Sequence, residues 1–324
     1  MLQQTRVETV IAYYGRFLRR FPTLAALAAA GHDEVLKTWE GLGYYRRILH
    51  LHNAARAIQG DGGIMPTTAD GLRSLPGVGE YTAAAIASIA HGQPVAAVDG
   101  NVARVIARLF GVEEDILSAK GKAAITDLAS QLIPTNRPGD FNQAWMDLGN
   151  STCAPRSPVC EECPLVTLCV ARRGGREGGL PVRGVGRSRP VPSLTFLVGI
   201  FVNDGRVLMR RRPTGGLWSG LWEPPTVEID AGLNPRRPLR ALAGESGVRL
   251  NGSARPAGMV KHRLTHRALT FHAYVAAVTP QGGVGDAPAP HRWVSAKALR
   301  RLSISTAHRH VLNVARDAIE SVRV

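Results

Sequence analysis

The sequence has no run of about eighteen apolar residues, so it encodes no membrane-spanning helix of ordinary length. Its N-terminus, MLQQTRVET, has neither the charged lead nor the apolar core of a signal peptide, which argues against secretion. No internal repeat is evident. These absences predict a soluble, globular protein of the cytoplasm.

Acidic residues are scarce relative to basic ones. The 324 residues include 25 Asp and Glu against 40 Lys and Arg, which gives a formal net charge of +15. Such an excess favours a polyanionic partner, although a general bias toward Arg, Ala and Gly would produce the same charge. The hydrophobic fraction of 44% is ample for two domains with buried cores.

Cysteine is absent except in one short segment, which holds Cys153, Cys160, Cys163 and Cys169. A structural disulfide framework would scatter its cysteines, so the clustering argues for a metal site in a reducing compartment. The cysteines are separated by six, two and five residues. Four thiolates at such short separations can ligate zinc or an iron–sulfur cluster, and the spacing alone leaves both open.

The stretch from Leu75 to Leu109 is the most informative part of the chain. A hairpin at PGVG, residues 76–79, would place backbone N–H groups at the start of the Ala-rich helix that follows, where they attract an anion such as a DNA phosphate. Asp99 follows in a loop at the mouth of the next helix, which it would cap. One compact unit could therefore hold a phosphate and direct a carboxylate at it, which predicts chemistry on a nucleotide.

Apolar spacing of three and four predicts that the first half is entirely helical. In the helix from Gln3 to Phe21 the buried face is expected to contain Val7, Val10, Ile11, Tyr14, Leu18 and Phe21. Further helices are expected over 23–30, 33–40 with Asp33 as N-cap, 101–110 and 120–133, with another through Ile48 and Ile58 and a last one capped by Asp140.

The period changes to two after residues 171–192, a segment rich in Gly, Arg and Pro that predicts a flexible basic linker. Strands are expected over 194–202 and 207–211, on either side of an Asn-Asp-Gly turn, and over 268–279. Helices near 238–244 and 306–322 complete an α+β second domain.

The hairpin and the following VDGNVARV resemble the helix-hairpin-helix DNA glycosylases, which include endonuclease III and the MutY-type adenine DNA glycosylases. The resemblance to the MutY type runs nearly the whole chain. It implies a mainly α fold: a helix-hairpin-helix glycosylase core with an iron–sulfur loop, followed by an α+β Nudix-like domain. The expected bounds are 1–170 for the core, with a [4Fe–4S] loop at 153–169, then the linker 171–192 and the Nudix-like domain 193–324.

The resemblance also assigns roles to residues around the hairpin. Asp99 matches the catalytic aspartate that stabilises the oxocarbenium-like sugar, and Asn101 would help to orient the site. Backbone groups of Gly77, Val78 and Gly79 would bind DNA. Gln4 and Tyr44 match the residues that enter the base stack when the target base is extruded.

Position 81 separates the branches of the superfamily. In the endonuclease III branch a lysine at this place attacks the sugar and cuts the backbone through a Schiff base. The present sequence has Tyr81, which matches a tyrosine that some adenine glycosylases place near the reacting sugar. The resemblance therefore implies a monofunctional glycosylase.

The second domain resembles the Nudix-like domain with which adenine glycosylases recognise 8-oxoguanine. The family's Phe-Ser-His loop corresponds to Leu264, Thr265 and His266, in which the hydroxyl is kept and the aromatic ring is lost. A working Nudix hydrolase needs a glutamate-rich helix to hold magnesium. Residues 240–248 match that helix only at Arg240, Glu245 and Gly247, and the missing glutamates argue against pyrophosphatase activity.

The resemblance implies a monomeric base-excision repair enzyme that removes adenine opposite 8-oxoguanine or guanine in double-stranded DNA, with the nucleoid as its place in the cytoplasm. Protonation of the leaving adenine needs a carboxylic acid. The family supplies a glutamate two residues before the methionine of its MLQQT motif, and that methionine is Met1 here. A start site upstream of Met1 is therefore expected. The alternatives are a catalytically impaired protein that binds 8-oxoguanine:adenine pairs, and a pyrimidine-lesion glycosylase of the endonuclease III type.

Overall fold

A computed structural model describes residues 1–2, 5–184, 191–213, 215–281 and 290–322. The helices of the first half are α1 (Val7–Arg20), α2 (Leu24–Ala29), α3 (His32–Thr38), α4 (Arg46–Gly60), α5 (Ala69–Arg73), α6 (Glu80–His91), α7 (Gly100–Phe110), α8 (Ala119–Leu132), α9 (Pro138–Ser151) and α10 (Val170–Arg173), with short 3-10 turns at Cys160–Glu162 and Val166–Leu168. Within the described ranges, no helix has both the length and the apolarity needed to cross a membrane.

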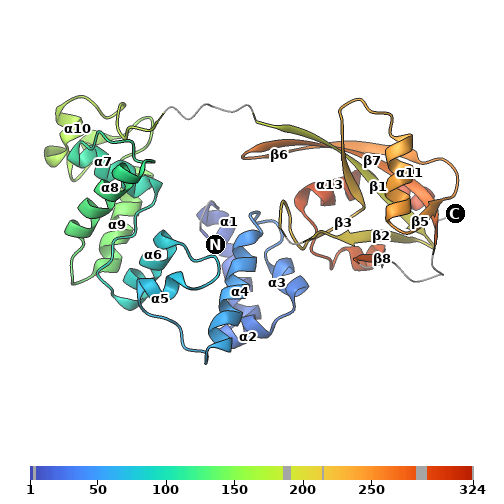
Figure 1. Ribbon diagram of the computed structural model, residues 1–324, viewed down its shortest axis with the longest axis horizontal. Helices are drawn as coiled ribbons and strands as arrows, with labels where there is room; N and C mark the ends of the chain where they lie inside the picture. Colours follow the sequence, from blue (N-terminus) through green and yellow to red (C-terminus); the bar gives the residue numbers. More distant parts are fainter. Residues whose placement is uncertain (3–4, 185–190, 214, 282–289, 323–324) are drawn as a thin grey trace. The chain divides into compact units, whose positions relative to one another are not determined.

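The second half forms a mixed sheet with helices (Figure 1). Its elements are β1 (Ser193–Asn203), β2 (Arg206–Arg211), β3 (Trp222–Glu223), β4 (Thr226–Ile229), α11 (Arg236–Glu245), β5 (Val248–Leu250), β6 (Arg255–Leu264), β7 (Arg267–Pro280), β8 (His291–Ser295), α12 (Ala296–Leu299), α13 (Thr306–Val314) and α14 (Arg316–Ser321).

The chain forms two compact units. One unit combines Met1–Ala55 with Arg189–Val324, and the other contains Arg56–Ser188. The first unit therefore joins the N-terminal helices to the sheet, although the two are distant in sequence. The expected domain bounds at 170/171 and 192/193 remain a prediction.

The core of the Arg56–Ser188 unit lies where α7, α8 and α9 pack together. Helix α7 contributes Val102, Val105 and Ile106, which are at most 4% exposed. The helix ends at Gly111, whose φ of 69° is the left-handed conformation that glycine adopts without steric cost. The segment after α9 also packs here, because Leu180 is buried and Ile116 N–H donates to the carbonyl of Val182.

Helix α1 differs from the expectation of one buried apolar face. Val10, Phe17 and Phe21 are buried, and Phe17 and Phe21 belong to the core of the N-terminal helices. The residues Val7, Ile11, Tyr14 and Leu18, which were expected to be buried, are 44–68% exposed. The apolar residues of α1 occupy two adjacent faces of the helix, and only the face with Phe17 packs within this unit.

Two expected helix caps were also wrong. Helix α3 begins one residue earlier than expected, with Gly31 as its N-cap, so Asp33 lies in the first turn. Helix α9 has Arg137 as its N-cap and Pro at its start, and Asp140 accepts a hydrogen bond from Arg137 Nε at 2.6 Å. In both helices the acidic side chain lies in the first turn, where its negative charge interacts favourably with the positive end of the helix dipole.

The sheet buries both of its faces. The order along its main path is β3-β2-β1-β7-β5, with β1 parallel to β7, and β6 pairs with β7 as an antiparallel hairpin. Successive residues of β1 alternate between two cores, so that Val198 packs toward α13 whereas Leu197 packs toward α11. The expected β1–β2 hairpin is confirmed, with Val202 opposite Val207.

Candidate functional site

The hairpin between α5 and α6 has the conformation that the sequence predicted. Gly77 has φ 76°, and Val78 N–H closes the turn on the carbonyl of Leu75 at 3.1 Å. Gly79 is the N-cap of α6, and no side chain caps this helix. A Cβ at Gly79 would have no atom within 4 Å, so the backbone there is open to an approaching group. The first N–H groups of α6 can therefore bind an anion.

Asp99 is the N-cap of α7. Its Oδ1 accepts from the N–H groups of Asn101 at 2.8 Å and Val102 at 2.7 Å. These two bonds fix the carboxylate at the start of the helix, as expected for a residue that combines a cap with a second role. Both donors bind Oδ1, so the cap does not engage Oδ2.

Tyr81 lies on the first turn of α6, and the charge of Asp99 affects the pKa of its phenol. Burial raises the pKa of the Tyr81 phenol, and the negative charge of Asp99 raises it further. The hydroxyl is therefore a proton donor at neutral pH, and it lies 3.5 Å from Sδ of Met146. The structure thus brings Tyr81 and Asp99 into one electrostatic environment.

Asn101 is held by polar contacts rather than directed into open space. Its Oδ1 accepts from Arg104 Nη1 at 3.0 Å, and its Nδ2 donates to Oδ1 of Asn150 at 3.2 Å. Arg104 is 3% exposed and also donates to the carbonyls of Gly149 and Cys153. Arg104 therefore links the start of α7 to the end of α9 and to the first cysteine.

Asn142 supports the loop that carries Asp99, a role that sequence reasoning missed. This buried side chain of α9 accepts from Ala97 N–H at 3.0 Å and donates to the carbonyl of Val95 at 2.9 Å. It also donates to Ser88 Oγ at 2.8 Å. All its partners lie at least 45 residues away, so no local sequence pattern could have identified it.

The four cysteines line one small cavity of about 30 Å³. Arg108, which is 2% exposed, lies at its wall and places Nη1 at 3.4 Å from Sγ of Cys153. The same guanidinium donates to the carbonyls of Ala154, Pro155 and Leu180. Among the described residues, no three His, Cys, Asp or Glu side chains converge closely enough to hold a metal ion as they stand. The donor set and the buried cation nevertheless suit an anionic centre with cysteine ligands.

Tyr44 lies at the tip of a loop shaped by left-handed residues. Gly41, Gly43 and Tyr44 have φ values of 99°, 71° and 46°, and for a tyrosine this backbone conformation is strained. Trp39 Nε1 donates to the carbonyl of Gly43 at 3.0 Å, and Gly41 N–H donates to Tyr45 Oη at 3.3 Å. Burial raises the pKa of Tyr45 to about 12, so this phenol remains neutral. Tyr45 is buried, whereas Tyr44 is 44% exposed.

Arg47 ties this loop to the N-terminus. Its guanidinium lies 5.5 Å from the centroid of the Tyr44 ring, within cation–π range. The same group donates to the carbonyl of Met1 at 2.9 Å and to Thr5 Oγ1 at 3.0 Å. Gln4, the other residue expected to enter the base stack, lies outside the described residues.

The turn between β6 and β7 contains the three residues that were expected to contact the lesion. Leu264 pairs with Arg267 at the end of the hairpin and packs partly buried against the sheet core. Thr265 and His266 form the turn itself. The Oγ1 of Thr265 lies 2.8 Å from the Oη of Tyr44, so two of the predicted DNA contacts meet in the Met1–Ala55 and Arg189–Val324 unit.

Two family models match the chain. The model described as HhH-GPD superfamily base excision DNA repair protein matches residues 1–133, and the NUDIX domain model matches residues 197–314. These matches confirm the expected fold class, a helix-hairpin-helix core followed by a Nudix-like domain.

Adenine DNA glycosylases are similar to nearly the whole chain. The human protein is 36% identical over 97% of this chain, which spans 66% of the human length. The rat protein is 35% identical over 97% of this chain and 70% of its own length. The fission yeast protein is 34% identical over 86% of this chain and 71% of its own length. The chain therefore belongs to the adenine DNA glycosylase family.

Proposed function

We propose that this protein is a monofunctional DNA glycosylase of base-excision repair that removes adenine paired with 8-oxoguanine or guanine. The observation that carries the proposal is the shared environment of Asp99 and Tyr81 beside the hairpin between α5 and α6. Membership of the adenine DNA glycosylase family supports the choice of base.

The chemistry follows from the geometry at the start of α7. Hydrolysis breaks the bond between N9 of adenine and C1′ of the sugar, adds the oxygen of water to C1′ and releases adenine with a proton. Positive charge develops on the sugar, and a fixed carboxylate stabilises it. Asp99 is fixed by the two backbone donors on Oδ1, and we assign it this role. Asn101 and Asn142 act as positioning residues for the loop.

Position 81 decides what happens to the DNA backbone. A bifunctional glycosylase needs an amine to form a Schiff base with the sugar. The phenol of Tyr81 cannot supply one, and its raised pKa keeps it protonated. The proposed product is therefore an abasic site in an intact strand.

The remaining predicted contacts are with three parts of the DNA: a backbone phosphate, the base stack and the base opposite adenine. We assign the N–H groups around Gly77, Val78 and Gly79 to a DNA phosphate, and Tyr44 together with Gln4 to the space left by the extruded base. The hydroxyl of Thr265, next to Leu264 and His266, is assigned to the opposite base. The proposed working form is a monomer on double-stranded DNA, associated through that DNA with the nucleoid of the cytoplasm.

We further propose that Cys153, Cys160, Cys163 and Cys169 hold a [4Fe–4S] cluster. When bound, the cluster would link these four cysteines of the 153–169 loop and would have a structural role outside the hydrolysis. The positive charge of Arg108 beside Cys153 suits such an anionic group. Anaerobically purified protein should be brown, with broad absorption at about 400 nm. Colourless protein that contains zinc would contradict this assignment.

A single-turnover assay tests the proposed activity. Excess protein is incubated with an 8-oxoguanine:adenine duplex, and samples are analysed with and without alkali. The proposal predicts strand breaks at adenine only after alkali. Efficient borohydride trapping on abasic DNA, or breaks without alkali, would show a lyase of the endonuclease III type instead.

A lesion-binding protein without catalysis is the second candidate, and the same assay separates it from the enzyme. Such a protein would bind the 8-oxoguanine:adenine duplex tightly and give no strand breaks after alkali.

A further inference from the structure

The N-terminal helices and the Nudix-like part share an apolar core. Leu221, from the GGLWSGLWEPP segment before β3, is 1% exposed and belongs to the core cluster of α1, α3 and α4. Gly220, with φ 74°, makes this approach possible, because a Cβ there would lie 2.8 Å from Nε2 of His32. The segment is thus an apolar anchor between two parts that are distant in sequence.

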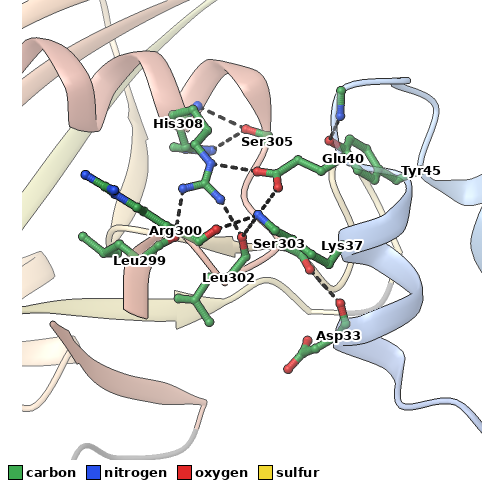
Figure 2. A network of polar contacts seen from close by, with 12 residues as sticks. Asp33, Lys37, Glu40, Tyr45, Leu299, Arg300, Leu302, Ser303, Ser305 and His308 are labelled. Carbon is green, nitrogen blue, oxygen red and sulfur yellow. Dashed lines mark hydrogen bonds and ion pairs between the residues drawn. The ribbon is translucent and has the colours of Figure 1, made fainter. Parts of the chain in front are cut away.

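A polar network also links these two parts of the chain (Figure 2). Lys37 Nζ donates to the carbonyls of Arg300 at 2.8 Å and Leu302 at 3.2 Å, and it forms an ion pair with Glu40. Arg309 Nε of α13 donates to Glu40 Oε1 at 2.7 Å. Glu40 therefore binds two cations, one from α3 and one from the Nudix-like part.

Arg309 is itself held in place by two carbonyl acceptors. Its Nη1 donates to Leu299 at 2.8 Å, and its Nη2 donates to Leu302 at 2.6 Å. A guanidinium with all three of its nitrogens engaged has little freedom to follow a moving partner. The position of Glu40 is consequently set by the segment that leads into α13.

Asp33 adds a second fixed point on α3. Its carboxylate accepts from Arg211 Nη2 at 2.7 Å, and its backbone carbonyl accepts from Ser303 Oγ at 2.9 Å. Figure 2 shows that Asp33, Lys37 and Glu40 lie along one side of α3 and the turn that follows, facing the 299–309 segment. Several contacts in one network lose less side-chain entropy per contact than isolated surface pairs do.

The strained loop from Gly41 to Tyr44 connects Glu40 to Tyr44, so the position of Glu40 affects the position of Tyr44. Glu40 immediately precedes the loop, and its carbonyl accepts from Tyr13 Oη at 2.8 Å. A Cβ at Gly41 would lie 2.4 Å from the same Tyr13 oxygen, so the loop fits closely against α1. At the other end of the loop, Tyr44 Oη lies 2.8 Å from Thr265 Oγ1.

We propose that Lys37, Glu40 and Arg309 are positioning residues that set the preference for the base opposite adenine, because they hold the phenol of Tyr44 against the hydroxyl of Thr265. The inference rests on the proposed function, in which the hydroxyl of Thr265 contacts that base. The bond with Tyr44 holds this hydroxyl in place, and a displacement of about an ångström would lose its bond to 8-oxoguanine.

The test compares affinities of the full-length chain for 8-oxoguanine:adenine and guanine:adenine duplexes, a ratio that requires no catalysis. Glu40→Ala should lower the ratio by about five- to tenfold, the size of one lost hydrogen bond to the lesion. Glu40→Gln, which keeps one acceptor and the side-chain volume, should lower it less. Glu114→Ala removes an ion pair with Lys120 elsewhere in the chain and should leave the ratio unchanged.

A double substitution separates positioning from a general loss of structure. Thr265→Val should lower the ratio, and adding Glu40→Ala to it should lower the ratio no further, because the two residues act through one contact. Multiplying effects, or an equal loss of affinity for both duplexes in Glu40→Ala, would overturn the inference. Wild-type protein without any preference would instead refute the proposed function, whereas a wild-type preference that Glu40→Ala leaves intact refutes the inference alone.

Discussion

At the scale of single residues, Asp99 has a structural role that is separable from the catalytic role proposed for it. Its Oδ1 caps α7, which fixes the carboxylate, and its charge raises the pKa of Tyr81. The cap needs an acceptor, whereas the proposed catalytic role needs the negative charge. The two roles can be separated by substitution, because asparagine keeps the acceptor and loses the charge.

Under the proposed function, Asp99→Asn should lower the single-turnover rate of adenine release by about a hundredfold or more, since electrostatic stabilisation of the sugar is lost. Its unfolding free energy should change little. Asp99→Ala should lower the rate similarly and should also cost about 1 kcal/mol of stability through the lost cap. Chemical denaturation alongside the excision assay distinguishes the two variants.

Tyr81→Lys should add lyase activity to the chain. The substitution places an amine on the first turn of α6, within the electrostatic field of Asp99, where it can attack C1′ of an abasic sugar. Borohydride should then trap the variant on abasic DNA, while the wild-type protein forms no covalent product. Equal trapping of both proteins would contradict the role assigned to position 81.

His308 makes stability depend on pH. Burial lowers the pKa of His308 from 6.5 to about 4; the charge of Glu223 opposes this shift, whereas Arg212, Arg210 and His262 reinforce it. The unfolded chain binds a proton below pH 6.5 and the folded chain does not until about pH 4. The unfolding free energy should therefore decrease as the pH is lowered from 6.5 to about 4, by about 3 kcal/mol at most. His308→Gln should lack this part of the pH dependence in denaturant titrations.

At the scale of elements, local chemistry predicted some features and tertiary packing decided others. The hairpin at Gly77, the cap at Asp99 and the turn between β1 and β2 follow from residues close together in sequence. Strand β6 was missed because Pro256 and Gly258 interrupt its pattern, and the structure places an irregular register between them.

Contacts between residues far apart in sequence decide how α1 packs and which side chains hold the candidate site in place. Neither feature could therefore be predicted from the sequence. Two faces of α1 are apolar, and the sequence does not say which one meets Trp39. Asn142, Arg104 and Arg108 bind carbonyl groups far away in sequence, so their roles depend on the folded arrangement. The hairpin conformation and the cap at Asp99 were predictable, whereas the side chains that hold them in place were not.

Close contact between α6 and α9 makes Gly139 a sensitive position. A Cβ there would lie 2.7 Å from Cα of Ile89 and 2.8 Å from the carbonyl oxygen of Ser88, both backbone atoms. Gly139→Ala should therefore cost about 1–3 kcal/mol of unfolding free energy. Gly244→Ala is the matched control, because a Cβ in this turn of α11 meets nothing within 4 Å. It should stabilise the protein by up to about 1 kcal/mol.

At the scale of the whole molecule, the net charge of +15 suits a protein that binds a polyanion. The two matched domains suit a protein that recognises one base pair within that polyanion. Binding to undamaged duplex should be mostly electrostatic. Its affinity should fall at least tenfold between 50 and 200 mM salt, because each phosphate contact releases counterions. An affinity that does not change with salt would contradict a phosphate-binding role for the hairpin.

The most direct test of the proposed function is the release of free adenine in a single turnover. Protein in excess over an 8-oxoguanine:adenine duplex, with the matched 8-oxoguanine:cytosine duplex as control, is sampled for free base by chromatography. The proposed function predicts adenine release from the mispaired duplex, with the phosphodiester backbone intact. Tight binding to the mispaired duplex without release of adenine would contradict it.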